Sequence, residues 1–170
     1  MNAALVRMFE YNRWANLAIL DACAALTEEQ FGARAAGTFG SIRRTLVHLV
    51  GSQDVFLWRL ASDNPQLERT AAELRGPWKN WDIVRRVNDR GSAGLIEAAR
   101  ATRDDDPDVR LPEYEGRVSL APRSFVLLHA LEHGIEHRAQ ICTTLTQIGA
   151  APPDLDGWGY AAATGVVRPT

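Results

Sequence analysis

Cysteine is scarce in this chain of 170 residues, and neither sign of charge dominates it. The two cysteines, Cys23 and Cys142, have neither CxxC spacing nor a small disulfide-rich context around them. This excludes a disulfide framework, so we expect two small core residues in a reducing compartment. A formal net charge of -2 leaves no broad basic surface, which argues against a nucleic acid as the partner.

Long apolar runs are missing as well. No stretch approaches the roughly 20 apolar residues that a membrane-spanning helix needs. Near the N-terminus, Arg7, Glu10 and Arg13 interrupt the continuous apolar segment that a secretory signal would require. The sequence therefore predicts a cytoplasmic protein that does not enter a membrane.

Hydrophobic residues make up 46% of the chain, and many of them recur with helical periodicity. That content is enough for residues 1–170 to bury one core, so a single domain is predicted. Apolar residues recur every three or four positions in four long stretches, which is the spacing of one helix face. The predicted helices cover residues 2–25, 42–60, 77–102 and 122–148.

Capping residues mark where the predicted helices begin. Thr27 with Gln30 forms a predicted capping box for a short turn after the first helix. Ser41 is the predicted N-cap of the second long helix, and Pro77 the predicted first residue of the third.

The segment before the fourth helix is predicted to be irregular, and a short tail follows that helix. Residues 109–120 alternate only partially around Gly116, which favours a hairpin-like excursion over a helix. The tail, with Trp158 and Tyr160, is expected to fold back on the body. The whole pattern predicts an all-α fold: a four-helix bundle with a crossover connection between helices 3 and 4 and a short C-terminal tail packing back.

Three of the four histidines, His129, His133 and His137, stand four residues apart in the predicted fourth helix. Side chains at this spacing share one helix face, so two neighbouring imidazoles can hold one ion. The outer pair would lie about 12 Å apart at about 1.5 Å per residue, so one of the three is expected to be a neighbour rather than a ligand. His48, at the edge of the apolar stripe of the second helix, is the natural third ligand. Imidazole suits Zn, Ni, Fe or Cu better than Ca or Mg.

The spacing leaves open which neighbouring pair binds the metal. The pattern HxxEH occurs twice, with Glu132 before His133 and Glu136 before His137. In inverted zinc-protease motifs such a glutamate is the general base, but this chain is too short for the cleft and extra domain of those enzymes. A helix also points both glutamates away from the histidine stripe. Gly134 removes bulk beside His133, which would make room for an ion or a ligand.

Four parts of the sequence together carry a family resemblance. They are Tyr11–Asn16 (YNRWAN), His48 followed ten residues later by Trp58, the motif His133-x-x-x-His137-Arg138-x-Gln140, and the tail Ile148–Asp156 (IGAAPPDLD). In these parts the chain resembles the DinB-like (DinB/YfiT) family of metal-binding four-helix bundles, over nearly its whole length. The resemblance implies His48, His133 and His137 as the metal ligands, with His129 supporting the ligands or the fold.

The resemblance also implies a cofactor, partners and a pocket. Family members bind a divalent ion, often Ni or Zn, and many resemble homodimers, so we expect both properties here. Asn12, Trp14 and Trp58 are candidates to line the pocket, with core filling as the alternative for the two tryptophans. Arg138 and Gln140 match the family motif, and a purely structural role is the alternative for both.

Three functions stay open at this stage. Family members with known activity include S-transferases that use bacillithiol or related low-molecular-weight thiols, and a mycothiol-dependent isomerase. Three imidazoles leave coordination positions free, and a metal ion lowers the pKa of a bound thiol or water. We therefore expect a metal-dependent enzyme that activates a low-molecular-weight thiol, supplied as a co-substrate, toward small electrophiles. The alternatives are a hydrolase that activates water and a non-catalytic metal-binding stress-response or structural protein.

Overall fold

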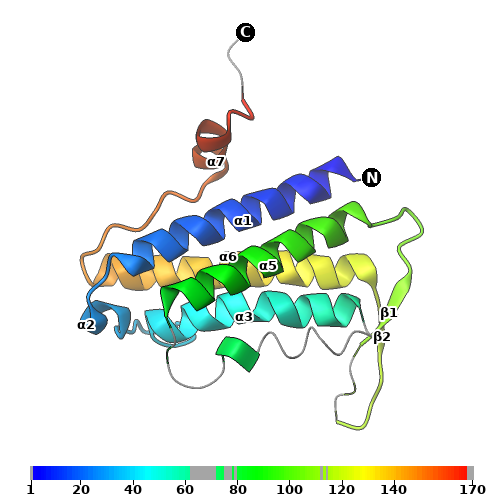
Figure 1. Ribbon diagram of the computed structural model, residues 1–170, viewed down its shortest axis with the longest axis horizontal. Coiled ribbons are helices and arrows are strands. Elements are labelled where there is room, and N and C mark those ends of the chain that lie inside the picture. The colour runs from blue at the N-terminus through cyan, green and yellow to red at the C-terminus, as the bar shows by residue number, and fades with distance from the viewer. Residues whose placement is uncertain are drawn as a thin grey trace.

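Four long helices lie side by side and form the body of the computed structural model, which describes residues 2–61, 72–74, 78, 80–111, 113 and 115–167 (Figure 1). The long helices are α1 (Ala3–Ala24), α3 (Ile42–Leu60), α5 (Trp81–Arg100) and α6 (Arg123–Gln147); the short elements are α2 (Glu28–Phe31), the 3-10 turn η1 (Ala72–Leu74), strands β1 (Asp108–Arg110) and β2 (Leu120–Pro122), and α7 (Gly157–Thr164). The predicted all-α class is confirmed for the described residues, since the two strands are only three residues each.

The long helices pack so that each has two close neighbours. Helix α1 packs against α5 and α6, and α3 packs against the same two helices, which leaves α1 and α3 diagonally opposite each other. In the described part of the chain, no helix has both the length and the apolar character that a membrane span requires.

Ser41 and the Thr27–Gln30 pair are confirmed as signals of helix starts, and Asn2 and Asn80 are further caps that were not predicted. The side chains of Asn2, Ser41 and Asn80 accept hydrogen bonds from backbone N–H groups in the first turns of α1, α3 and α5. Thr27 and Gln30 form the predicted capping box.

The predicted start of the third helix is wrong. Helix α5 begins at Trp81, because Asn80 supplies the cap that satisfies its first free N–H groups. Pro77, the predicted first residue, lies outside the described residues.

The hairpin-like excursion is present as an antiparallel pair of strands, in which Val109 lies opposite Ala121. The tail contains a helix that was not predicted, α7. Tyr160 on this helix is buried against Tyr11 and Trp14, with ring centroids 5.8 and 5.6 Å away. Trp158 does not pack back on the body, since 76% of its surface is exposed.

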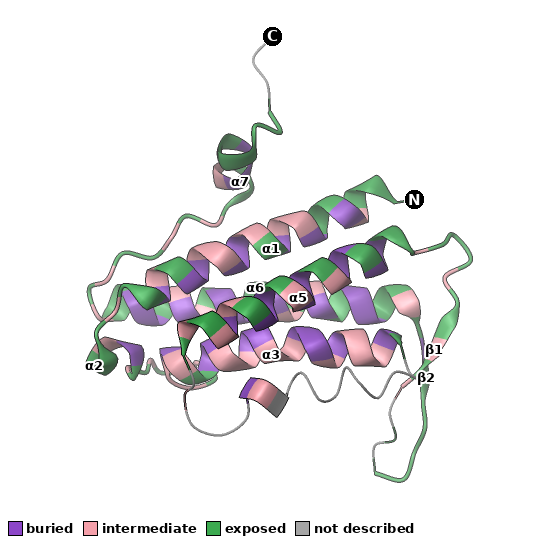
Figure 2. Ribbon diagram, viewed as in Figure 1, coloured by how far each residue is buried: buried purple, intermediate pink, exposed green. Residues whose placement is uncertain are grey.

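Two apolar clusters fill the interior between the long helices, one toward each end. Figure 2 shows buried residues on all four long helices. On α3, for example, Leu46 and Leu49 belong to one cluster and Phe56 and Leu60 to the other. Buried polar side chains occupy the level between the clusters: Asn12 and Asn16 on α1, Gln53 on α3, Asn88 and Ser92 on α5, and Arg138 on α6.

Hydrogen bonds connect this polar layer across the helices. The carboxamide oxygen of Asn88 accepts from Asn16 at 3.2 Å and from Gln53 at 3.1 Å. The Ser92 hydroxyl donates to Gln53 at 2.9 Å. Each of these bonds joins two different helices, so the layer fixes how α1, α3 and α5 are aligned along their axes.

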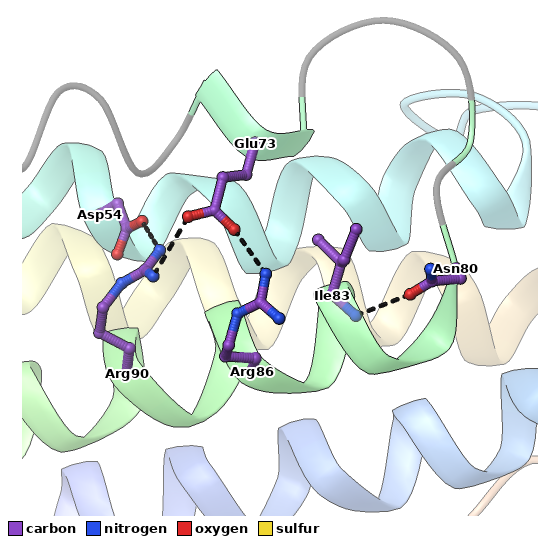
Figure 3. A network of polar contacts seen from close by, with 6 residues as sticks. All are labelled: Asp54, Glu73, Asn80, Ile83, Arg86 and Arg90. Carbon is purple, nitrogen blue, oxygen red and sulfur yellow. Dashed lines mark hydrogen bonds and ion pairs between the residues drawn. The ribbon is translucent and has the colours of Figure 1, made fainter.

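A network of ion pairs holds η1 against α3 and α5 (Figure 3). Asp54 on α3 has a fully buried side chain and accepts a hydrogen bond from Arg90 on α5 at 2.8 Å. Arg90 also approaches Glu73 of η1, 3.7 Å away. Glu73 accepts a hydrogen bond from Arg86 at 2.9 Å. Because Leu74 follows Glu73 and packs beside Gly51, this network places Leu74 over α3.

Replacing Arg90 by Met should lower the free energy of unfolding by about 3 kcal/mol, because the buried Asp54 carboxylate would lose its ion-pair partner. The Asp54→Leu, Arg90→Met double variant should recover most of that loss. Arg86→Met is the matched control, since its pair with Glu73 is exposed and should be worth less than about 1 kcal/mol. Urea unfolding of the four proteins measures these differences, and equal losses for Arg90→Met and Arg86→Met would contradict the argument.

Candidate metal centre

Three histidines from two helices converge at the level of the polar layer. His48 comes from α3, and His133 and His137 come from successive turns of α6. Each of the three offers one ring nitrogen, and these nitrogens all lie within 4.8 Å of one another. The Nε2 atoms of His48 and His133 are 3.0 Å apart. Such a cluster of imidazole nitrogens is the donor set that zinc, nickel, iron or copper prefers.

His129 lies outside this cluster, one turn before His133. Its ring packs edge-on against Phe56, with centroids 5.2 Å apart, and its Nδ1 is 3.6 Å from the Glu132 carboxylate. Nearly half of the His129 side chain is exposed. The helix rise separates it from His137 as the spacing argument expects.

Burial keeps two of the three clustered histidines in their neutral form. It is the largest cause that lowers the pKa of His133, to about 3, followed by the neighbouring His137 and His48. The pKa of His48 is also lowered, first by burial and then by His137 and Arg44. A neutral imidazole has the free lone pair that a metal ligand needs, so the charge state of the cluster suits metal binding.

Gln140 orients the His137 ring. Its side-chain oxygen lies 3.0 Å from Nδ1 of His137 and also accepts a hydrogen bond from the backbone N–H of Phe39 at 3.1 Å. A proton on Nδ1 therefore satisfies this contact and leaves the lone pair on Nε2. Outer hydrogen bonds of this kind fix the tautomer of metal-ligating histidines.

Phe39 is part of the site and was not anticipated from the sequence. It lies in the loop before α3, stacks on the His48 ring at a centroid distance of 4.3 Å, and meets His137 edge-on at 5.2 Å. The guanidinium carbon of Arg44 lies over the Phe39 ring, 4.9 Å from its centroid. In the sequence, Phe39 is an aromatic residue between Gly37 and Gly40, and this pattern does not indicate a metal site.

A pocket of about 500 Å³ opens beside the histidines. His48, His133 and His129 contribute to its wall, with Phe56 and Arg59 further along α3; the other lining residues are Val47, Gly51, Ser52, Val55 and Leu74. The pocket gives a small molecule direct access to two of the three clustered histidines.

Two expected pocket residues lie elsewhere. Trp58 lines a second, neighbouring pocket of about 340 Å³, together with Arg59 and His129. Asn12 is buried on α1, where its carboxamide oxygen accepts a 2.6 Å hydrogen bond from Arg138. Asn12 is not at the pocket because successive residues of α6 face different helices: His133 and His137 face α3, whereas Gly134 and Arg138 face α1.

Gly134 makes room for α1 rather than for an ion. A Cβ atom at this position would lie 2.5 Å from the Asn12 carboxamide oxygen and 2.9 Å from Nη1 of Arg138. Arg138 donates from the same nitrogen to Asn16 at 2.7 Å. The family-motif arginine is therefore a structural residue that joins α6 to α1.

Neither the two cysteines nor the two glutamates of the HxxEH patterns line the pocket beside the histidines. Burial raises the pKa of Cys23 to about 12 and also raises the pKa of Cys142, so neither forms a thiolate readily. Glu132 and Glu136 are exposed, and Glu136 accepts a hydrogen bond from the Gln140 amide at 3.1 Å. No carboxylate is among the described residues that line the pocket beside the histidines.

Replacing Gln140 by Leu should weaken metal binding by about 10- to 100-fold, because His137 would lose the acceptor that fixes its tautomer. Competition against a chromogenic chelator measures the change. Glu136→Ala is the control, since Glu136 contacts Gln140 but is exposed. Equal affinities for Gln140→Leu and the unmodified protein would show that the contact has no such role.

Replacing Gly134 by Ala should lower the free energy of unfolding by about 1–2 kcal/mol, although alanine is the better helix former. The added Cβ would collide with the bonded Asn12 and Arg138. Metal uptake should be unchanged, because the collision is on the α1 side. Gly157→Ala, where nothing lies within 4 Å, is the control for thermal unfolding, and a loss of metal binding without a loss of stability would refute this assignment.

Comparison with known proteins supports the resemblance seen in the sequence. No curated protein matches the chain. The model of the DinB family matches residues 1–168, which is nearly the full length. The chain therefore belongs to the DinB family.

Proposed function

We propose that this protein binds a divalent metal ion, with Ni or Zn as the leading candidates, and acts as a metal-dependent enzyme on small molecules. His48, His133 and His137 would hold the ion. The observation that carries the proposal is the convergence of their three ring nitrogens within 4.8 Å beside a pocket of about 500 Å³. Membership of the DinB family agrees with a metal site.

The number of histidines favours a reactive site over a purely structural one. Structural zinc sites are usually closed by four protein ligands, whereas catalytic sites keep a position free. Within the described residues, the cluster has three candidate ligands. When bound, the ion would act as a Lewis acid that lowers the pKa of a thiol or a water molecule in the pocket.

A low-molecular-weight thiol is our leading co-substrate. Both cysteines have raised pKa values and stand outside the pocket lining, so a thiol nucleophile would have to come from solution. The apolar side chains Val47, Val55 and Leu74 would exclude water around the reacting sulfur. The sulfur would bond to an electrophilic carbon of the second substrate, and the leaving group would depart with the electron pair.

Hydrolysis by activated water is the second candidate within catalysis, and a non-catalytic stress-response or structural role is the third. The hydrolase needs no thiol. The absence of a lining carboxylate among the described residues disfavours it, because no general base of that kind faces the pocket.

Three further properties belong to the proposal. The packing of α1, α3, α5 and α6 supports a four-helix bundle with a crossover connection between its third and fourth helices, α5 and α6. Exposed apolar side chains on α1, α6 and α7, namely Met8, Ile135 and Trp158, support a homodimer. A cytoplasmic location agrees with the two free cysteines.

The test measures metal content and electrophile consumption together. Purified protein should take up about one equivalent of Ni or Zn, and a monochlorobimane assay with bacillithiol or cysteine should give turnover only when metal and thiol are both present. The His133→Ala, His137→Ala double variant should lose both signals, because two of the three ligands are missing.

His129→Ala is the matched control, since His129 shares the helix face but lies outside the cluster. It should keep its metal. Turnover without thiol would favour the hydrolase, and metal uptake without any turnover would favour the non-catalytic role. If the unmodified protein takes up no divalent metal, the proposed function is wrong.

A further inference from the structure

Arg59 brings a permanent positive charge to the far end of the histidine pocket. It lies on α3 and is half-buried. Its guanidinium carbon is 5.6 Å from the centroid of the Phe56 ring, and that ring in turn meets His133 edge-on at 5.4 Å. The Phe56 ring therefore contacts both the guanidinium and one of the clustered histidines.

The pocket-facing residues of α3 explain this placement. His48, Ser52, Val55 and Arg59 follow one another at intervals of four, three and four residues, so they lie on one helix face, and all four line the pocket. His48 and Arg59 are about 16 Å apart along the helix axis at about 1.5 Å per residue. Helical side chains lean toward the N-terminus, so the long Arg59 side chain reaches back toward His48.

The charges along the pocket wall are one-sided. Among the described residues that line it, Arg59 carries the permanent charge, and no carboxylate is present to neutralise it. Glu113 lines the second pocket, and no ion pair joins it to Arg59. Between the histidines and Arg59, the wall is apolar apart from the Ser52 hydroxyl.

We propose that Arg59 binds a carboxylate, so that the natural substrate is a small molecule with a carboxylate at one end and its reactive group at the histidine end. A guanidinium pairs with a carboxylate through two parallel hydrogen bonds, which suits one arginine and a singly charged group. The side chains of Val55, Phe56 and Leu74 fit an apolar middle section. That the reactive group lies at the histidine end rests on the proposed function. The carboxylate site itself depends only on Arg59.

The test compares two probes that differ only in charge, 3-phenylpropionate and 3-phenylpropanamide. Calorimetric titration at pH 8, where imidazoles are mostly neutral, should give the carboxylate at least about tenfold tighter binding, the effect of a charged hydrogen bond. Arg59→Gln should abolish that preference, and Arg59→Lys should keep part of it. Arg117→Gln, an exposed arginine that lines neither pocket, should keep all of it.

Each outcome decides the proposal. It is overturned if neither probe binds the unmodified protein, if both bind equally, or if Arg59→Gln keeps the preference while unfolding at the same temperature as the unmodified protein. The titration is repeated after removal of metal by a chelator, and the preference should persist. A chain that binds no metal but prefers the carboxylate would refute the proposed function alone, and a metal-loaded chain without the preference would refute the carboxylate site alone.

Discussion

The buried guanidinium of Arg138 is the constraint on which the arrangement of the helices depends. Only 2% of the residue is exposed, and burial lowers its pKa to about 10, so it stays charged at neutral pH. Asn12 and Asn16 compensate the buried charge by accepting its hydrogen bonds at 2.6 and 2.7 Å. A charge held in this way tolerates little sliding of α6 along α1, because a shift of one residue would break both bonds.

The same constraint positions the candidate metal centre. Asn16 passes the network on to Asn88, and Asn88 to Gln53 on α3, so the polar layer links all four long helices between two apolar clusters. The clustered histidines lie at this level, on the opposite side of α6 from Gly134 and its contacts with α1. One turn of α6 thus serves both the fold and the site, with different faces for each.

The surroundings of the histidines divide into a fixed part and an accessible part. Gln140 and Phe39 hold the His137 and His48 rings from one side, while the pocket exposes His48 and His133 from the other. In a reactive metal site, outer contacts orient the ligands and at least one coordination position stays open. Under the proposed function, the Arg59 charge would add a means of selecting among substrates.

The sequence by itself determined the elements with strong local signals. The long helices and the capping box of Thr27 and Gln30 followed from periodicity and from short-range hydrogen bonding. The spacing of His129, His133 and His137 showed that one of the three must stand apart. The start of α5 and the helix α7 were missed, although their N-caps, Asn80 and Asp156, are local signals that the sequence carries. Only the tertiary structure decided that Asn12 and Gly134 serve Arg138 and that Phe39 and Arg59 belong to the site. Those roles depend on which helix each side chain faces, and sequence spacing fixes a residue's place on its own helix but not the neighbour it meets.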